Sequence, residues 1–241
     1  MTDKIEAFKK KEAYTLADVR ELVQILRSEN GCAWDREQTH ASVRNAMIEE
    51  TYEFIEGVDK NDLALMKEEL GDVMFQVFFH ARIAEENGNF DIDAIADEVC
   101  RKMVFRHPHV FGEVTVKNSA EVLQNWDAIK KTEKSRDTLE KQLESVSSAL
   151  PSLIRAEKLL SRCKREGVPV ERDAEKLTAC IREKAMALAS DATSEQIGEL
   201  LFSVAHLSYA LKINSEQALY DRNDRFVRDK IAESMGKTLE S

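Results

Sequence analysis

Apolar side chains recur at spacings of three and four residues along most of this chain, and few stretches alternate strictly. Such spacing places apolar side chains on one face of an α-helix, whereas strict alternation is typical of a half-buried strand. Only 8 glycines and 3 prolines interrupt the 241 residues, so long helices are possible. The sequence therefore predicts an all-α protein with one large domain or two small ones, each able to bury a core.

Four longer helices are expected in the first half of the chain. Their predicted ranges are 16–27, 42–58 with Ser42 as the N-cap, 63–86 ended by Gly88, and 92–105 ended before His107 and Pro108.

A segment in the second half repeats one in the first. Residues 69–87 resemble residues 196–214 at a constant offset, with Gly71 matching Gly198 and Phe75 matching Phe202. The repeat predicts a duplicated helical bundle. The expected divisions are a first domain at 14–113, a charged and partly helical connector at 114–148, and a second copy at 149–241.

Two pairs of acids, Glu50 with Glu53 and Glu69 with Asp72, lie within the apolar stripes of the second and third predicted helices. Members of each pair are three residues apart and share a helix face. Burying an uncompensated carboxylate costs several kcal/mol, so these groups are expected to bind a cation. Oxygen-only ligands favour Mg²⁺, with Mn²⁺ as a possible substitute. We expect Gly71, between the second pair, to allow close helix packing.

A di-iron centre is the alternative for a carboxylate-rich helical bundle. Such centres use a Glu-x-x-His motif on each of two helices. Only Glu37 and His40 have that spacing here, and they lie before the first ligand helix, so magnesium is favoured.

The second copy is expected to be degenerate. Gln196 and Glu199 stand where the first copy has Glu69 and Asp72, and with a small gap Glu183 and Met186 match Glu50 and Glu53. Two of the four acids are therefore missing. A site at the same place in the second copy is not expected to hold the same metal.

Charge and composition limit the classes of binding partner that are expected. The formal net charge of −10 argues against binding duplex nucleic acid through a general basic surface. The four cysteines form no CxxC pair, and no run reaches the roughly 18 apolar residues of a membrane span. We therefore expect a soluble cytoplasmic protein with reduced thiols.

Three motifs carry a resemblance to a known family. The acids lie in Glu49-Glu50-Thr51-Tyr52-Glu53 and Glu69-Leu70-Gly71-Asp72, which resemble the EExxE…ExxD motif of the MazG family. Residues 30–40, NGCAWDREQTH, are similar to that family's NGCPWDxxQTH loop, with Ala33 in place of the usual proline. Residues 106–111 resemble its RHPHVF segment.

This resemblance implies an all-α nucleoside triphosphate pyrophosphohydrolase that releases nucleoside monophosphate and pyrophosphate. It implies that Glu50, Glu53, Glu69 and Asp72 ligate Mg²⁺ in the first domain. Glu49 would orient water, while the residues expected to bind substrate are Trp34, Arg36, Gln38, Lys102 and Arg106.

Two further expectations concern assembly and role. A single repeat presents an open apolar face, so a homodimer is expected. The alternative to an enzyme is a non-catalytic regulatory or scaffolding module that retains the fold.

Overall fold

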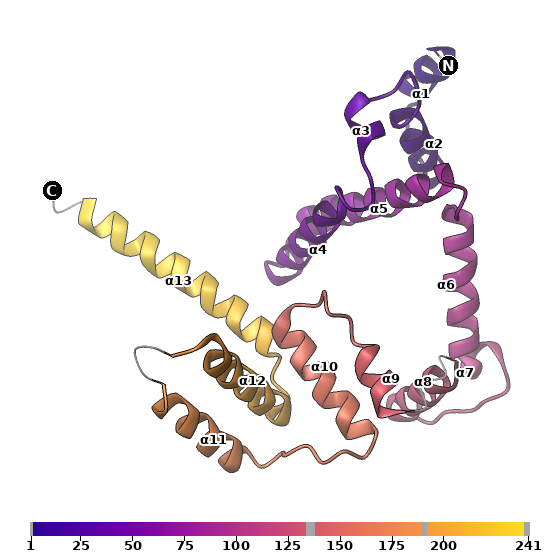
Figure 1. Cartoon of the computed structure of the whole chain (residues 1–241). Helices are drawn as coiled ribbons and strands as arrows, with labels where there is room; N and C mark the ends of the chain where they lie inside the picture. The colour runs from indigo at the N-terminus through magenta and orange to yellow at the C-terminus, as the bar shows by residue number, and fades with distance from the viewer. Residues whose placement is uncertain (1, 134–137, 189–191, 239–241) are drawn as a thin grey trace. The chain divides into compact units, whose positions relative to one another are not determined.

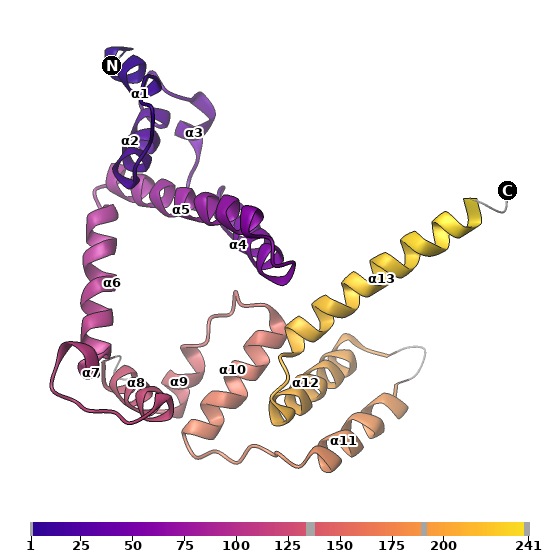
Figure 2. The ribbon, with the colours of Figure 1, turned by 180° about the vertical axis from the view of Figure 1, so that it is seen from behind.

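The structure, a computed structural model, describes residues 2–133, 138–188 and 192–238, and all regular secondary structure within these ranges is helical (Figures 1 and 2). The all-α prediction is therefore confirmed. The chain divides into two compact units, Met1–Lys117 and Asn118–Ser241. None of the described helices combines the length and apolar character needed to cross a membrane.

The first unit contains the helices α1 to α7. Their bounds are α1 Thr2–Lys9, α2 Leu16–Leu26, α3 Ala33–Glu37, α4 Arg44–Asp59, α5 Leu63–Glu86, α6 Ile92–Arg106 and α7 Pro108–Phe111.

Helix α5 begins and ends where the sequence predicted, because both ends follow local rules. The Asp62 side chain accepts hydrogen bonds from the backbone N–H groups of Ala64 and Leu65 at 3.0 and 3.1 Å, which caps the first turn. At the other end Gly88 has a φ of +70°. Its N–H donates to the Glu85 carbonyl, while the N–H of Asn89 donates to the Ala84 carbonyl. This is the hydrogen-bond pattern of a glycine-terminated helix.

The predicted N-cap of α4 was wrong. Val43, not Ser42, is the N-cap residue, and no side chain caps this helix. The Ser42 hydroxyl instead accepts a hydrogen bond from the Thr39 N–H at 2.9 Å and donates one to Gln38 Oε1 at 2.8 Å. Ser42 therefore closes the preceding loop.

Helices α4 and α5 form an antiparallel hairpin with the most extensive helix contact of the first unit (Figure 1). Gly57 permits their close approach, because a Cβ atom at that position would lie 3.0 Å from both Cγ and the backbone nitrogen of Met66. The expectation for Gly71 was wrong, since a Cβ atom there would meet nothing within 4 Å.

The core of the first unit lies where α2 packs against α5. Val23, Val43, Phe79 and Ile83 form a buried cluster, with Phe75 packed against it. Because Val43 belongs to this cluster, the start of α4 is fixed against α5 near the acidic residues of both helices.

The second unit contains the helices α8 to α13. Their bounds are α8 Ser119–Glu133, α9 Leu139–Glu144, α10 Ser152–Arg165, α11 Ala174–Met186, α12 Ser194–Leu211 and α13 Ser215–Thr238.

Its most extensive helix contact joins α11 and α12, the helices that carry the residues matched to the acids of the first copy. The segment expected as a connector, 114–148, contributes α8 and α9 to this unit. Residues 134–137 of that segment, and 189–191 and 239–241 of the expected second copy, lie outside the described residues.

Candidate metal centre and nucleotide site

The α4–α5 hairpin brings three of the four predicted ligands together. Carboxylate oxygens of Glu50 on α4 and of Glu69 and Asp72 on α5 all lie within 4.8 Å of one another. Glu69 is buried, with 6% of its surface exposed, whereas Asp72 is exposed and Glu50 is half-buried. The cluster therefore reaches from the protein interior to the surface.

Two carboxyl groups in this cluster have pKa values raised above the usual value for glutamate. Burial raises the pKa of Glu69, and the negative charges of Glu53, Asp72 and Glu50 raise it further. Burial also raises the pKa of Glu50, to which the charges of Asp72, Glu53 and Glu49 add. Burial and like charges both favour the protonated form of a carboxyl group.

The cluster fits a hard divalent cation. Within the part of the chain that the structure describes, no lysine or arginine pairs with Glu50, Glu69 or Asp72. Glu69 Oε2 is buried and has no hydrogen-bond partner among those residues, which is costly for a polar atom. A cation among these oxygens would remove both penalties, and Mg²⁺ and Mn²⁺ prefer such oxygen ligands.

The two other acids of the motif lie at the edge of this cluster. Glu53 is exposed and does not join the three grouped carboxylates. It is close enough for its charge to raise the pKa of both Glu50 and Glu69. Glu49 is exposed on α4 and acts on the pKa of Glu50 in the same way.

The loop before α4 holds three predicted substrate residues on and beside the short helix α3. Trp34 is 63% exposed, so its indole does not anchor the loop in the core. The Gln38 side-chain amide donates to the Trp34 carbonyl at 2.8 Å, while Arg36 donates to the Glu29 carbonyl at 2.8 Å. Trp34 is thus presented to the outside by a loop with internal hydrogen bonds.

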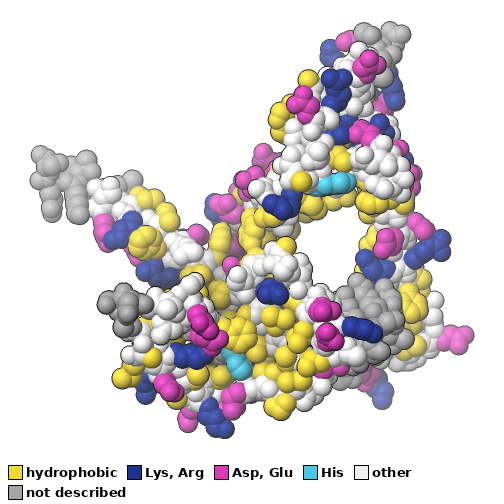
Figure 3. Space-filling view, in the orientation of Figure 1, with side chains coloured by type: hydrophobic (Ala, Val, Ile, Leu, Met, Phe, Trp, Pro, Cys, Tyr) yellow, Lys and Arg dark blue, Asp and Glu magenta, His cyan; other side chains and the backbone are white. Residues whose placement is uncertain are grey.

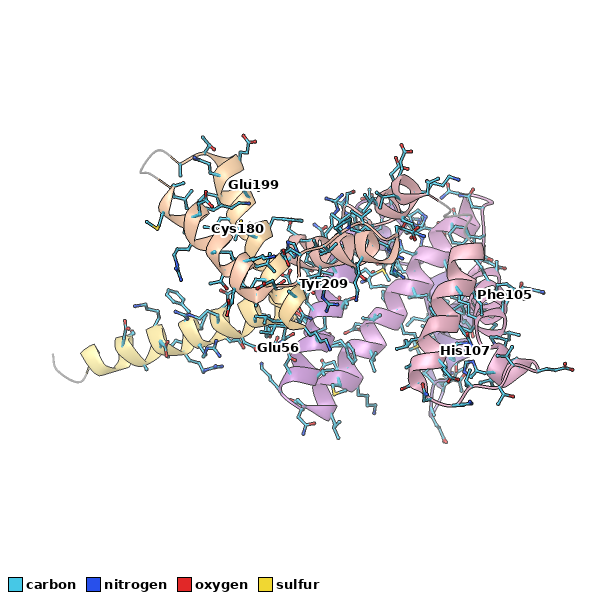
Figure 4. The ribbon with its side chains drawn as sticks, turned by 90° about the horizontal axis from the view of Figure 1, so that it is seen from below. Glu56, Phe105, His107, Cys180, Glu199 and Tyr209 are labelled. Carbon is cyan, nitrogen blue, oxygen red and sulfur yellow. The ribbon has the colours of Figure 1, made fainter. Side chains whose placement is uncertain are left out.

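The two predicted basic residues lie on α6, away from the carboxylates in the single chain. This helix contacts α5 and then runs away from the α4–α5 hairpin, as Figure 1 shows. Lys102 is half-buried and Arg106 is buried, with 5% of its surface exposed. Both lie toward the end of α6 at which Figure 4 labels Phe105 and, next after the helix, His107.

Sequence reasoning missed a contact that fixes the loop. Arg27 is buried after α2 and donates to the carbonyls of Asp35 and Gln38 while pairing with Glu86. An arginine has several donors and can join distant segments, but the partners of Arg27 are far apart in the sequence and form no motif that would identify it.

The counterpart of the hairpin in the second unit has a different arrangement. Lys184 on α11 pairs with Glu199 on α12, with Nζ 2.7 Å from Oε2, and also donates to the Ser203 hydroxyl at 2.9 Å. Figure 4 shows Glu199 on α12, beside α11. A lysine ammonium therefore neutralises the residue that matches Asp72.

The fold and the carboxylates define an all-α protein with a candidate divalent-cation centre between two antiparallel helices. Residues 38–111, which include this hairpin, match the family model described as the MazG nucleotide pyrophosphohydrolase domain. The chain belongs to the MazG family, as its similarity to curated relatives over most of its length also shows.

Among these relatives is the nucleoside triphosphate pyrophosphohydrolase of Escherichia coli K12. It is 36% identical over 216 residues, which cover 86% of this chain and 82% of the relative. The nucleoside triphosphate pyrophosphohydrolase/pyrophosphatase MazG of Thermotoga maritima is 36% identical over 231 residues, covering 91% and 89%. The uncharacterized protein YabN of Bacillus subtilis is 39% identical over 216 residues, which cover 87% of this chain but 44% of YabN.

Proposed function

We propose that this protein hydrolyses nucleoside triphosphates between the α- and β-phosphates, with its active site in the first unit. Water adds to the α-phosphorus, the bond to the bridging oxygen breaks, and nucleoside monophosphate and pyrophosphate leave. The observation that carries the proposal is the buried, unpartnered oxygen of Glu69 beside Glu50 and Asp72. The names of the E. coli and T. maritima relatives support the same reaction.

Glu50, Glu69 and Asp72 would hold Mg²⁺, or Mn²⁺ in its place, and Glu53 would complete the set. When bound, such a cation neutralises phosphate charge and lowers the pKa of water. The four carboxylates would orient the cation through their fixed places on two packed helices. Glu49, one residue before Glu50, would accept a hydrogen bond from the attacking water and orient it.

The loop before α4 would bind the nucleoside. The exposed Trp34 offers a flat indole face on which a base can stack. Arg36 and Gln38 would add polar contacts from the same loop. Lys102 and Arg106 would contact the phosphates.

We also propose that the protein is a homodimer. Several large apolar side chains of the first unit are exposed on α6 and α7, including Phe105 at 58%, Val110 at 62% and Phe111 at 61%. Figure 3 shows such apolar surface among the charged side chains. A second copy that covered this face would also bring another chain close to Lys102 and Arg106. Light scattering that gives a monomer at all concentrations would contradict this.

A cytoplasmic location is part of the same proposal. All four cysteines are free thiols, which is usual in a reducing compartment that also contains the nucleotides.

Pyrophosphate release from canonical and modified nucleoside triphosphates, with and without Mg²⁺, tests the proposal. We expect Glu69→Gln to reduce turnover by about 10³-fold or more, because the buried ligand charge is lost while the shape is kept. Glu68→Gln, on the exposed side of the same helix, is the matched control and should retain most activity. A wild-type protein that releases no pyrophosphate from any of these substrates would instead favour the scaffolding alternative.

A further inference from the structure

We propose that Arg27 is a positioning residue for the nucleotide: its buried guanidinium holds the loop 32–40 in the conformation that presents Trp34. This inference rests on the proposed function, because it assumes that Trp34 contacts the nucleoside. Arg27 itself touches neither substrate nor cation and would act through the loop backbone.

Both edges of the Arg27 guanidinium are occupied. On one edge, Nε lies 3.1 Å and Nη2 lies 2.7 Å from Glu86 Oε2 on α5. On the other edge, Nη1 donates to the main-chain carbonyls of Asp35 and Gln38, the latter at 3.2 Å. The side chain is only 5% exposed, and its plane lies over the Phe79 ring with 5.1 Å between the guanidinium carbon and the ring centroid. Arg27 therefore joins α2, the loop and α5 at a single buried point.

The far end of the loop is tied to α5 as well. His40 Nδ1 lies 2.8 Å from His80 Nδ1, and the two rings are stacked with an interplanar angle of 2°. His80 follows Asp72 by eight residues on α5, which is about 12 Å along a helix axis. A nucleoside triphosphate is long enough to span that interval. The tied loop thus lies within reach of a nucleotide whose phosphates bind at the carboxylates.

The position of Trp34 depends on these loop contacts, because its side chain does not pack in the core. Its indole is 63% exposed, while the carbonyls that accept from Arg27 belong to Asp35 and Gln38, on the same turn and just after it. Gln38 in turn donates to the Trp34 carbonyl. Loss of the Arg27 donors would remove the hydrogen bonds that hold the loop backbone next to Trp34, whose indole is exposed.

Only arginine has the geometry for this task. Its planar guanidinium offers five donors in a fixed fork, so it can serve a carboxylate on one edge and carbonyls on the other. Lysine keeps the positive charge for Glu86 but has one compact ammonium. This ammonium cannot contact Glu86 and the two loop carbonyls at once.

The test compares Arg27→Lys with Arg82→Gln in the full-length protein. Arg82 also pairs with Glu86, at 2.9 Å, but donates to Glu85 rather than to the loop. We expect Arg27→Lys to raise the KM for a nucleoside triphosphate about tenfold, with kcat changed less than about threefold, because uniform substrate binding is lost. Mn²⁺ affinity, measured by titration calorimetry, should not change. Backbone amides of residues 32–40 should exchange hydrogen faster, and Arg82→Gln should alter none of these quantities.

Several outcomes would overturn the inference. These are an unchanged KM for Arg27→Lys, an equal rise for Arg82→Gln, or loop amides that exchange as in the wild type. Should Arg27→Lys fail to fold, the double variant Arg27→Met/Glu86→Met removes the buried guanidinium together with its carboxylate partner and should show the same rise in KM. Failure of both variants to fold would assign Arg27 to core stability alone. Hydrogen exchange needs no substrate. It therefore tests whether Arg27 holds the loop even if the wild type releases no pyrophosphate and the proposed function fails.

Discussion

The packing of the α4–α5 hairpin predicts opposite effects of two glycine-to-alanine substitutions on the free energy of unfolding. Alanine favours a helix over glycine by about 1 kcal/mol at either position. At Gly57 the new methyl group would lie 3.0 Å from Cγ and the backbone nitrogen of Met66, so the two helices must move apart. Crowding of this kind costs about 1–3 kcal/mol, so Gly57→Ala should lower the free energy of unfolding by up to about 2 kcal/mol. At Gly71 nothing lies within 4 Å, and Gly71→Ala should raise that free energy by about 1 kcal/mol.

Thermal unfolding followed by circular dichroism in EDTA distinguishes the two variants. A change of 1 kcal/mol shifts Tm by about 4 °C in a domain of this size. Gly57→Ala should also weaken Mg²⁺ binding, because the methyl group moves Glu50 on α4 away from Glu69 on α5. The packing argument is refuted if Gly57→Ala is more stable than the wild type. It is equally refuted if Gly71→Ala is the less stable variant.

Three further predictions concern the cation, the second unit and pH. EDTA should abolish pyrophosphate release, and Mg²⁺ or Mn²⁺ should restore it with little change in the far-ultraviolet dichroism; activity that survives chelation would exclude a cation-dependent site. Glu199→Gln should break the pair with Lys184 but leave turnover within about twofold, since it lies outside the proposed site; a loss like that of Glu69→Gln would move the active site to the second unit. Hydrogen bonds from Lys11 and from the Thr15 N–H and hydroxyl lower the pKa of Asp18 from its usual 3.8 to about 2. Its ionised form therefore stabilises the fold above the usual pKa, and this stability is lost as the pH falls toward 2. The advantage of the wild type over Asp18→Asn in denaturant titrations should thus be full at pH 6 and shrink toward pH 2, and an advantage independent of pH would contradict this.

Local rules made parts of the fold predictable. The bounds of α5 follow from a capping aspartate before it and a left-handed glycine after it, and both signals lie within a few residues of the helix ends. Three of the predicted ligands converge because a spacing of three residues on α5, and a tight turn between α4 and α5, fix their positions. The exposure of Glu53 could not be predicted from residue spacing, because it depends on the rotation of α4 about its axis relative to α5.

Contacts between distant segments were beyond the reach of the sequence. Glu86 follows Arg27 by 59 residues, and their pairing requires α2 to lie against the end of α5. The assignment of close packing to Gly71 failed for a related reason, because facing residues across a hairpin depend on its register. The register places Gly57, not Gly71, against the partner helix.

The two helix hairpins differ in how their acidic side chains are neutralised, which is the basis for proposing a bound cation in the first unit and not in the second. In both units, acids on one helix face the other helix, and their charge needs a partner. In α11 and α12 that partner is Lys184, whose ammonium lies 2.7 Å from Glu199 and 2.9 Å from the Ser203 hydroxyl. In α4 and α5, Thr51 follows Glu50 where Lys184 follows Glu183, and the Thr51 hydroxyl donates to its own helix at the Met47 carbonyl. Among the residues that the structure describes, no lysine or arginine therefore pairs with the three grouped carboxylates of the first hairpin. Introducing one through Thr51→Lys should neutralise the cluster, raise the stability of the metal-free protein and abolish Mg²⁺ binding; unchanged Mg²⁺ affinity in that variant would show that the absence of a lysine is not what leaves this centre open to a metal.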